Sequence, residues 1–160
     1  MPWANPSPLA LHHGTVDLHV ASILTAIDVT HGRLSTDFSK GFYTTTNYAQ
    51  AHRHALNMLT RLRSRGARRG VVLSYAVDRD AIANLRSLAF ARATDDYWHL
   101  VDWCRDGKPS HHAAGYYDVV CGPVARNIQR RVIYEEYDQI SFHTPESVTV
   151  LSNPNTSFVP

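Results

Sequence analysis

Two stretches of the chain decide its fold: LHHGT at residues 11–15 and DFSKGFYTTT at residues 37–46. The first follows an apolar run that begins at Leu9, and it predicts a strand that ends in a histidine, a glycine and a hydroxyl. The second has aromatic and β-branched residues after Gly41, and it predicts a strand in which Phe42 and Tyr43 face opposite sides. Each stretch alone also fits an ordinary strand and turn. Together they are typical of the two sides of one pocket.

Length and composition favour one globular domain. The chain has 160 residues, of which 44% are hydrophobic and 19% are charged, and its formal net charge is +2. This low net charge does not by itself indicate a protein that binds nucleic acid or a membrane through its overall charge. Cys104 and Cys121 suggest neither a disulfide framework nor a Cys-x-x-Cys metal pair. The paired histidines His111 and His112 lack partners at metal-ligand spacing, so we expect no metal.

The chain also lacks the marks of a membrane protein or an exported one. No apolar run approaches the roughly 20 residues of a membrane span. The first residues have no basic region followed by an apolar core, as a signal peptide would. We therefore expect a cytoplasmic protein in a reducing compartment, with no membrane partner.

Apolar spacing and capping residues predict the remaining elements. Asn47 is a good N-cap for a helix whose apolar stripe runs to Leu62, with Gly66 as its C-terminal cap. Further helices are expected over residues 16–29, 78–85 and 94–107, and strands over 70–77, 87–91, 116–121, 140–142 and 148–151. Gly122-Pro123 is expected to end the strand over 116–121.

This order of elements predicts one α+β domain over residues 9–152, with two packed, mainly antiparallel sheets and flanking helices. Residues 1–8 are expected to be an extended lead-in and residues 153–160 a C-terminal tail.

Arginines are concentrated between residues 61 and 69, where five of nine positions are arginine. The run suggests a nucleic-acid or acidic partner. We favour the other interpretation, cations that complement the C-terminal end of a helix, because the run is local and the overall charge is low.

Three blocks in a fixed order resemble a known family. They are DFSKGFYTTTNYAQA at 37–51, YYDVVCGPVA at 116–125 and YDQISFHT at 137–144. They resemble DUF3990, a bacterial family of uncharacterised domains grouped with the ADP-ribosyltransferases. HGT followed by GFYTT resembles the histidine–tyrosine branch of these enzymes, which includes the catalytic domains of diphtheria toxin and poly(ADP-ribose) polymerase. The resemblance runs from about Leu11 to about Leu151, and it implies an ADP-ribosyltransferase-like fold with an NAD cleft.

The resemblance implies roles for individual residues. His13 and Thr15 would hold the nicotinamide ribose or amide, and Gly14 would allow close approach. Tyr43 would stack on nicotinamide with help from His54. The implied binding set is His13, Gly14, Thr15, Arg33, Gly41, Phe42, Tyr43, Thr44 and His54. Arg33 would contact the dinucleotide phosphates, but it could equally be an exposed residue of a loop. His54 could likewise be a solvated residue of a helix.

Position 139 is the main departure from the resemblance. The transferases usually have a glutamate there, which stabilises the oxocarbenium as nicotinamide leaves, so the implied catalytic set is Gln139, Tyr43 and His13. Glutamine can hold a ribose hydroxyl but carries no negative charge, and losing one such stabiliser costs about 3 kcal/mol. Asp138 and Glu136 would face the opposite side of a regular strand. Gln139 is also compatible with an ordinary polar strand residue.

On this resemblance we expect an NAD-dependent mono-ADP-ribosyltransferase-like protein. It would be a bacterial toxin or effector that uses NAD as its substrate, releases nicotinamide, and modifies a protein or a nucleic acid. It would act in the cytoplasm, or in that of a target cell, and an antitoxin or immunity protein would be its neutralising partner. One alternative is a non-catalytic NAD-binding or nucleotide-binding module that has lost the glutamate. Another is a nucleic-acid-modifying enzyme that uses the arginine run.

Overall fold

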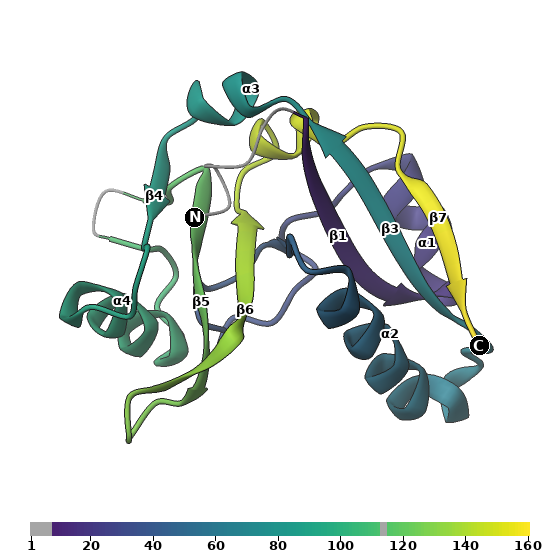
Figure 1. The fold of residues 1–160 in the computed structure, drawn as a ribbon, viewed down its shortest axis with the longest axis horizontal. Coiled ribbons are helices and arrows are strands. Elements are labelled where there is room, and N and C mark those ends of the chain that lie inside the picture. Colours follow the sequence, from purple (N-terminus) through teal and green to yellow (C-terminus); the bar gives the residue numbers. More distant parts are fainter. Residues whose placement is uncertain (1–7, 113–114) are drawn as a thin grey trace.

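Two sheets form the framework of the protein (Figure 1). The computed structural model describes residues 8–112 and 115–160. The three-stranded sheet has the order β1-β3-β7, and the four-stranded sheet has the order β2-β6-β5-β4. All pairs are antiparallel except the parallel pair β4–β5. The strands are β1 (Leu9–Val16), β2 (Phe42–Thr44), β3 (Gly70–Val77), β4 (Ser87–Ala89), β5 (Val119–Asn127), β6 (Val132–Phe142) and β7 (Asn155–Val159).

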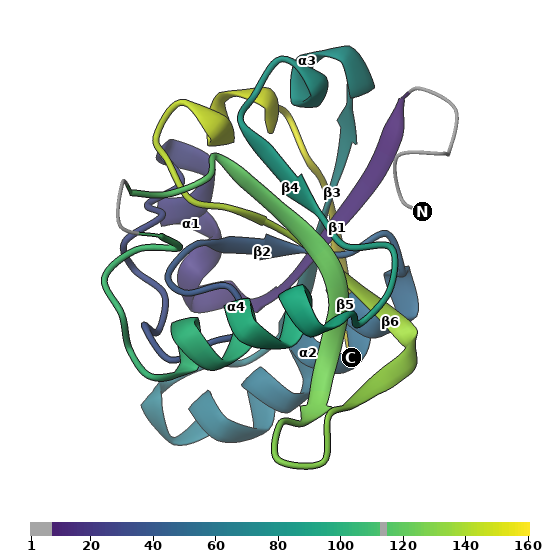
Figure 2. The same ribbon diagram turned by 90° about the vertical axis from the view of Figure 1, so that its left-hand side faces the viewer.

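Helices α2 and α4 cover the outer faces of the two sheets, whereas α1 and α3 pack against the core between the sheets. Ala51 and Ala55 of α2 pack on Val72 of β3 and Val159 of β7. The buried face of α4 packs on the four-stranded sheet through Tyr97, on the side away from the other sheet (Figures 1 and 2). The α-helices are α1 (Asp17–Thr25), α2 (Tyr48–Leu62), α3 (Arg79–Ala83) and α4 (Asp95–Arg105), and the 3-10 helices are η2 (Arg63–Arg65) and η3 (Ser147–Val150). The expected α+β fold with two mainly antiparallel sheets is therefore confirmed.

The largest core lies between the two sheets. Leu9 and Leu11 of β1 meet Phe42 of β2 and Ile140 of β6 there, all of them buried. These residues recur at every second position of their strands, which directs them to one face. The alternation of apolar residues along the strands thus explains which side chains fill the core between the sheets.

Local capping chemistry sets the ends of the longer helices. The Asn47 side chain accepts a hydrogen bond from Gln50 N, and Thr94 accepts one from Tyr97 N. Gly66 closes η2 with φ of 99°, a conformation that costs glycine little. The predicted starts of α2 and α4 and the predicted glycine cap are confirmed.

The C-terminal segment differs from expectation. Residues 155–159, predicted to belong to a tail, form β7 and pair with β3 from Gly70↔Val159 to Ser74↔Asn155. Residues 148–151, predicted to be the closing strand, contribute to η3 instead. The prediction was wrong because NTSFV is mostly polar and exposed, as an edge strand allows. The expected lead-in over residues 1–8 lies almost wholly outside the described residues.

β5 also runs further than expected, through Gly122-Pro123 to Asn127. Its pairing with β4 ends at Ala89↔Cys121, and the register with β6 shifts between Pro123 and Val124. A proline is tolerated at such a bulge, where a ladder hydrogen bond is missing.

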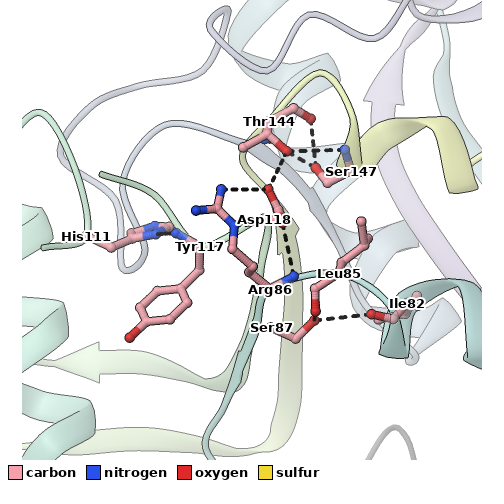
Figure 3. Close-up of polar contacts among 9 residues, drawn as sticks. All are labelled: Ile82, Leu85, Arg86, Ser87, His111, Tyr117, Asp118, Thr144 and Ser147. Atoms are coloured by element: carbon pink, nitrogen blue, oxygen red, sulfur yellow. Dashed lines mark hydrogen bonds and ion pairs between the residues drawn. The ribbon is translucent and has the colours of Figure 1, made fainter. Parts of the chain in front are cut away.

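A buried carboxylate holds the end of the sandwich nearest η3 (Figure 3). Asp118 accepts hydrogen bonds from Arg86 N at 3.0 Å, from Arg86 Nε at 3.2 Å and from Thr144 Oγ1 at 2.9 Å. Burial alone would raise the pKa of Asp118, but these hydrogen bonds lower it overall. The carboxylate therefore joins the starts of β4 and β5 to the end of β6.

Candidate functional site

β1 and β2 touch at one point and then diverge. His12 N donates to Thr45 O at 2.8 Å, and Thr45 N donates to His12 O at 2.9 Å. Backbone N–H and C=O groups of alternate strand residues face the same edge. Those of Gly14 therefore face β2, as those of His12 do, but within residues 8–112 and 115–160 they have no backbone partner there. We call the region of His13, Gly14, Phe42 and Tyr43 the strand fork.

His13 bridges the two strands of the fork. Its Nδ1 lies 2.7 Å from Tyr43 O, and its ring stacks on that of Phe42 with centroids 4.1 Å apart. A carbonyl oxygen only accepts, so Nδ1 carries the proton and Nε2 of the neutral ring is an acceptor. Burial lowers the pKa of His13 to about 4, which keeps the ring neutral at pH 7.

The phenol of Tyr43 points away from His13. Its hydroxyl donates to Ser39 O at 2.6 Å, accepts from Phe38 N at 3.1 Å and lies 2.9 Å from Thr36 Oγ1. Burial raises the pKa of this hydroxyl. His13 thus meets the Tyr43 backbone, while the Tyr43 ring is fixed by the segment that precedes Gly41.

Gln139 is buried and already engaged. Its Nε2 donates to Asp37 Oδ2 at 2.8 Å and to Pro123 O at 2.7 Å. Both partners are acceptors, so the amide oxygen points away from them. Asp37 is also paired with Arg105 and accepts from Ala125 N at 2.8 Å.

The expected convergence of His13, Tyr43 and Gln139 is not found. Tyr43 pairs with Ser141, two residues from Gln139, so alternation puts Tyr43 and Gln139 on one face of the sheet. Phe42 and the ring stacked on it, His13, lie on the other face. The sequence could not predict that His13 and Gln139 lie on opposite faces of the sheet. No local pattern indicates the residues that hold the side chain of Gln139.

The two glycines of the predicted site are required for packing. A Cβ at Gly14 would overlap the Ala51 carbonyl oxygen and lie 3.0 Å from Ala55 N. A Cβ at Gly41 would lie 2.7 Å from both His143 Nδ1 and Phe142 O. The close approach at Gly14 that we expected for a ligand is made by helix α2.

The remaining predicted residues are spread over the surroundings of the fork. Thr15 is buried, and Thr44 Oγ1 donates to Ile140 O at 2.8 Å. Arg33 is exposed and forms no ion pair with any described residue. His54 is exposed on α2.

Comparison with known proteins gives a family. The chain matches the model of a protein family of unknown function, DUF3990, over residues 9–133. The chain belongs to the DUF3990 family. No curated protein and no solved structure matches it. The DUF3990 match includes both stretches of the fork and ends before Gln139.

Two buried histidines lie near the fork: His111, which the sequence suggested only as half of an unpartnered metal pair, and His143, which no sequence pattern indicated. His111 and His143 meet edge to face with ring centroids 4.2 Å apart. His111 Nε2 donates to Phe38 O at 2.7 Å, and His143 Nδ1 donates to Lys40 O at 2.6 Å. Burial lowers the pKa of His111 to about 4 and that of His143 to about 3. Both neutral rings hold the segment that carries Asp37 and ends at Gly41.

Two cavities of this DUF3990 protein lie outside the fork. One of about 500 Å³ is lined by the outer half of β6, residues 90–93, Gly122, Pro123 and Thr46. Another, of about 220 Å³, lies between Leu9 and α3. The described part of the chain gathers no metal-binding group of three or more histidine, cysteine or acidic side chains, and it has no helix that could cross a membrane.

Proposed function

We propose that this DUF3990 protein binds NAD at the strand fork and transfers its ADP-ribose to an acceptor. The proposal depends on the N–H and C=O of Gly14, which have no backbone partner among residues 8–112 and 115–160 and lie on one strand edge next to His13. A carboxamide offers a carbonyl acceptor and two N–H donors. The nicotinamide carboxamide therefore complements Gly14 with two hydrogen bonds.

His13 supports the same proposal. Its Nδ1 is engaged by Tyr43 O, and the stacked Phe42 ring fixes the plane of the imidazole. Its Nε2 is then a fixed acceptor for a hydroxyl of the nicotinamide ribose. In the proposed reaction the bond from C1′ to nicotinamide breaks, the acceptor nucleophile bonds to C1′ and loses its proton, and nicotinamide leaves with the bonding electron pair.

A second candidate function is supported by the surroundings of Gln139. Both N–H groups of its amide are engaged, and the nearest carboxylate, Asp37, is paired with Arg105. Position 139 therefore offers the developing oxocarbenium no free negative charge. This favours a module that binds NAD without transferring ADP-ribose.

Calorimetric titration with NAD and chromatographic detection of nicotinamide test both functions. We expect binding by the natural protein, and at least tenfold weaker binding by His13→Ala because one hydrogen bond and the ring contact are lost. His99→Ala, an exposed histidine of α4, is the matched control and should bind normally. Absence of NAD binding by the folded natural protein would overturn the proposal. Binding without release of nicotinamide, with or without acceptor, would select the non-catalytic module.

A further inference from the structure

An exposed group of arginines lies where α2 ends and β3 begins. We call Arg61, Arg63, Arg65, Arg68 and Arg69 the arginine cluster. All five side chains are exposed, and within the described parts of the chain none of them forms an ion pair. The cluster is therefore a concentrated positive charge in a protein whose net charge is only +2.

The helix end does not account for the whole cluster. Gly66 ends the helical segment, and Arg68 and Arg69 follow it, beyond the reach of the helix dipole. The Arg69 guanidinium instead lies 5.4 Å from the ring centroid of Phe158 on β7. Phe158 is 61% exposed, the most exposed of the large hydrophobic residues described. An exposed ring thus adjoins the positive charge.

The cluster lies close to the strand fork. Gly70 of β3 pairs with Val16 of β1, and Asp17 N donates to Arg69 O at 3.0 Å. Gly14 precedes Val16 by two residues, which is about 7 Å along a strand. A long anionic molecule held by the arginines therefore passes the end of β1 that carries the fork.

We infer that the arginine cluster and Phe158 bind single-stranded nucleic acid, and that this polymer is the acceptor of the proposed transfer. Guanidinium groups pair with backbone phosphates, and an exposed ring stacks on a base. An acidic protein segment would use the arginines but would gain little from the ring. The inference that this polymer is the acceptor rests on the proposed function, whereas the binding surface does not.

Fluorescence anisotropy with a labelled, mixed-sequence RNA of 20 nucleotides tests the surface. The natural protein should bind more weakly as salt rises, with a log–log slope of about −0.7 for each phosphate contacted. Arg65→Ala and Arg68→Ala should each bring the slope closer to zero by about 0.7. Phe158→Ala should weaken binding about tenfold and leave the slope unchanged, because stacking is not electrostatic. Arg130→Ala, which removes an exposed arginine outside the cluster, should change neither.

Competing polyanions decide between partners. Binding of polyglutamate or of phosphatidylserine vesicles as tightly as RNA would overturn the assignment to nucleic acid, as would normal RNA binding by Phe158→Ala.

Labelled NAD, added with the RNA and a protein lysate, tests the acceptor. The inference about the acceptor is supported if the label is transferred to RNA by the natural protein but not by the arginine variants, although these variants still bind NAD. Transfer of the label to protein alone overturns it. If NAD does not bind while RNA binding shows the expected pattern, the proposed function fails and the surface stands.

Discussion

The amide of Gln139 and the carboxylate of Asp37 form a matched donor–acceptor pair in the interior. Gln139→Glu would replace the donor by a second carboxylate, 2.8 Å from the first and facing Pro123 O at 2.7 Å. Like charges at this separation destabilise a buried site, so we expect a loss of about 3 kcal/mol in the free energy of unfolding at pH 7. Urea denaturation measures it, and the loss should shrink at acid pH as the new carboxyl group takes up a proton.

A double replacement separates this explanation from simple disruption. Asp37→Asn combined with Gln139→Glu exchanges the carboxylate and the amide between the two positions. Because the pair is complementary again, the double variant should be more stable than Gln139→Glu alone. Equal or additive losses would contradict the pairing. The cycle also bears on the missing glutamate: restoring it at position 139 is not expected to give activity while Asp37 is present.

At the scale of elements, Gly14 sets how closely α2 lies against β1. In Gly14→Ala the new Cβ would overlap the Ala51 carbonyl oxygen, which belongs to helix backbone and cannot rotate away. We expect α2 to shift, at a cost of about 2–3 kcal/mol in the free energy of unfolding. Gly66→Ala is the control: it has a strained φ of 99° but open space, and should cost only about 1 kcal/mol. Equal costs in urea denaturation would show that close packing is not the reason for Gly14.

Elements that depend on local chemistry could be predicted from the sequence. Asn47 and Thr94 cap their helices through neighbours within three residues, and the strand at Gly70–Val77 is apolar along most of its length. β7 could not be predicted, because its polar sequence is a strand only through pairing with β3. The same holds for β5 beyond Pro123, where the bulge depends on a partner strand.

At the scale of the whole molecule, the sequence predicted half of the candidate site. LHHGT and GFYTT do meet, through the hydrogen bond from His13 to Tyr43 O. The other half depends on contacts between residues that are distant in sequence. Asp37 joins Arg105, Ala125 and Gln139 from three separate elements, and no local pattern marks such a group. The side of the strand that each of these residues faces therefore had to come from the three-dimensional arrangement.

The buried neutral histidines make the whole fold sensitive to acid. Burial lowers the pKa from 6.5 to about 4 for His13 and His111 and to about 3 for His143. Between these values the unfolded chain binds more protons than the folded one, so stability is full above about pH 6.5 and falls as pH decreases. Each such histidine adds a slope of about 1.4 kcal/mol per pH unit to the free energy of unfolding. Urea denaturation from pH 7 to 5 should show this, and His111→Gln should reduce the slope by about 1.4 kcal/mol per pH unit, even if it lowers stability at pH 7. His99→Gln, on the exposed side of α4, should leave the slope unchanged. The same slope in both variants would mean that His111 is not held neutral by the fold.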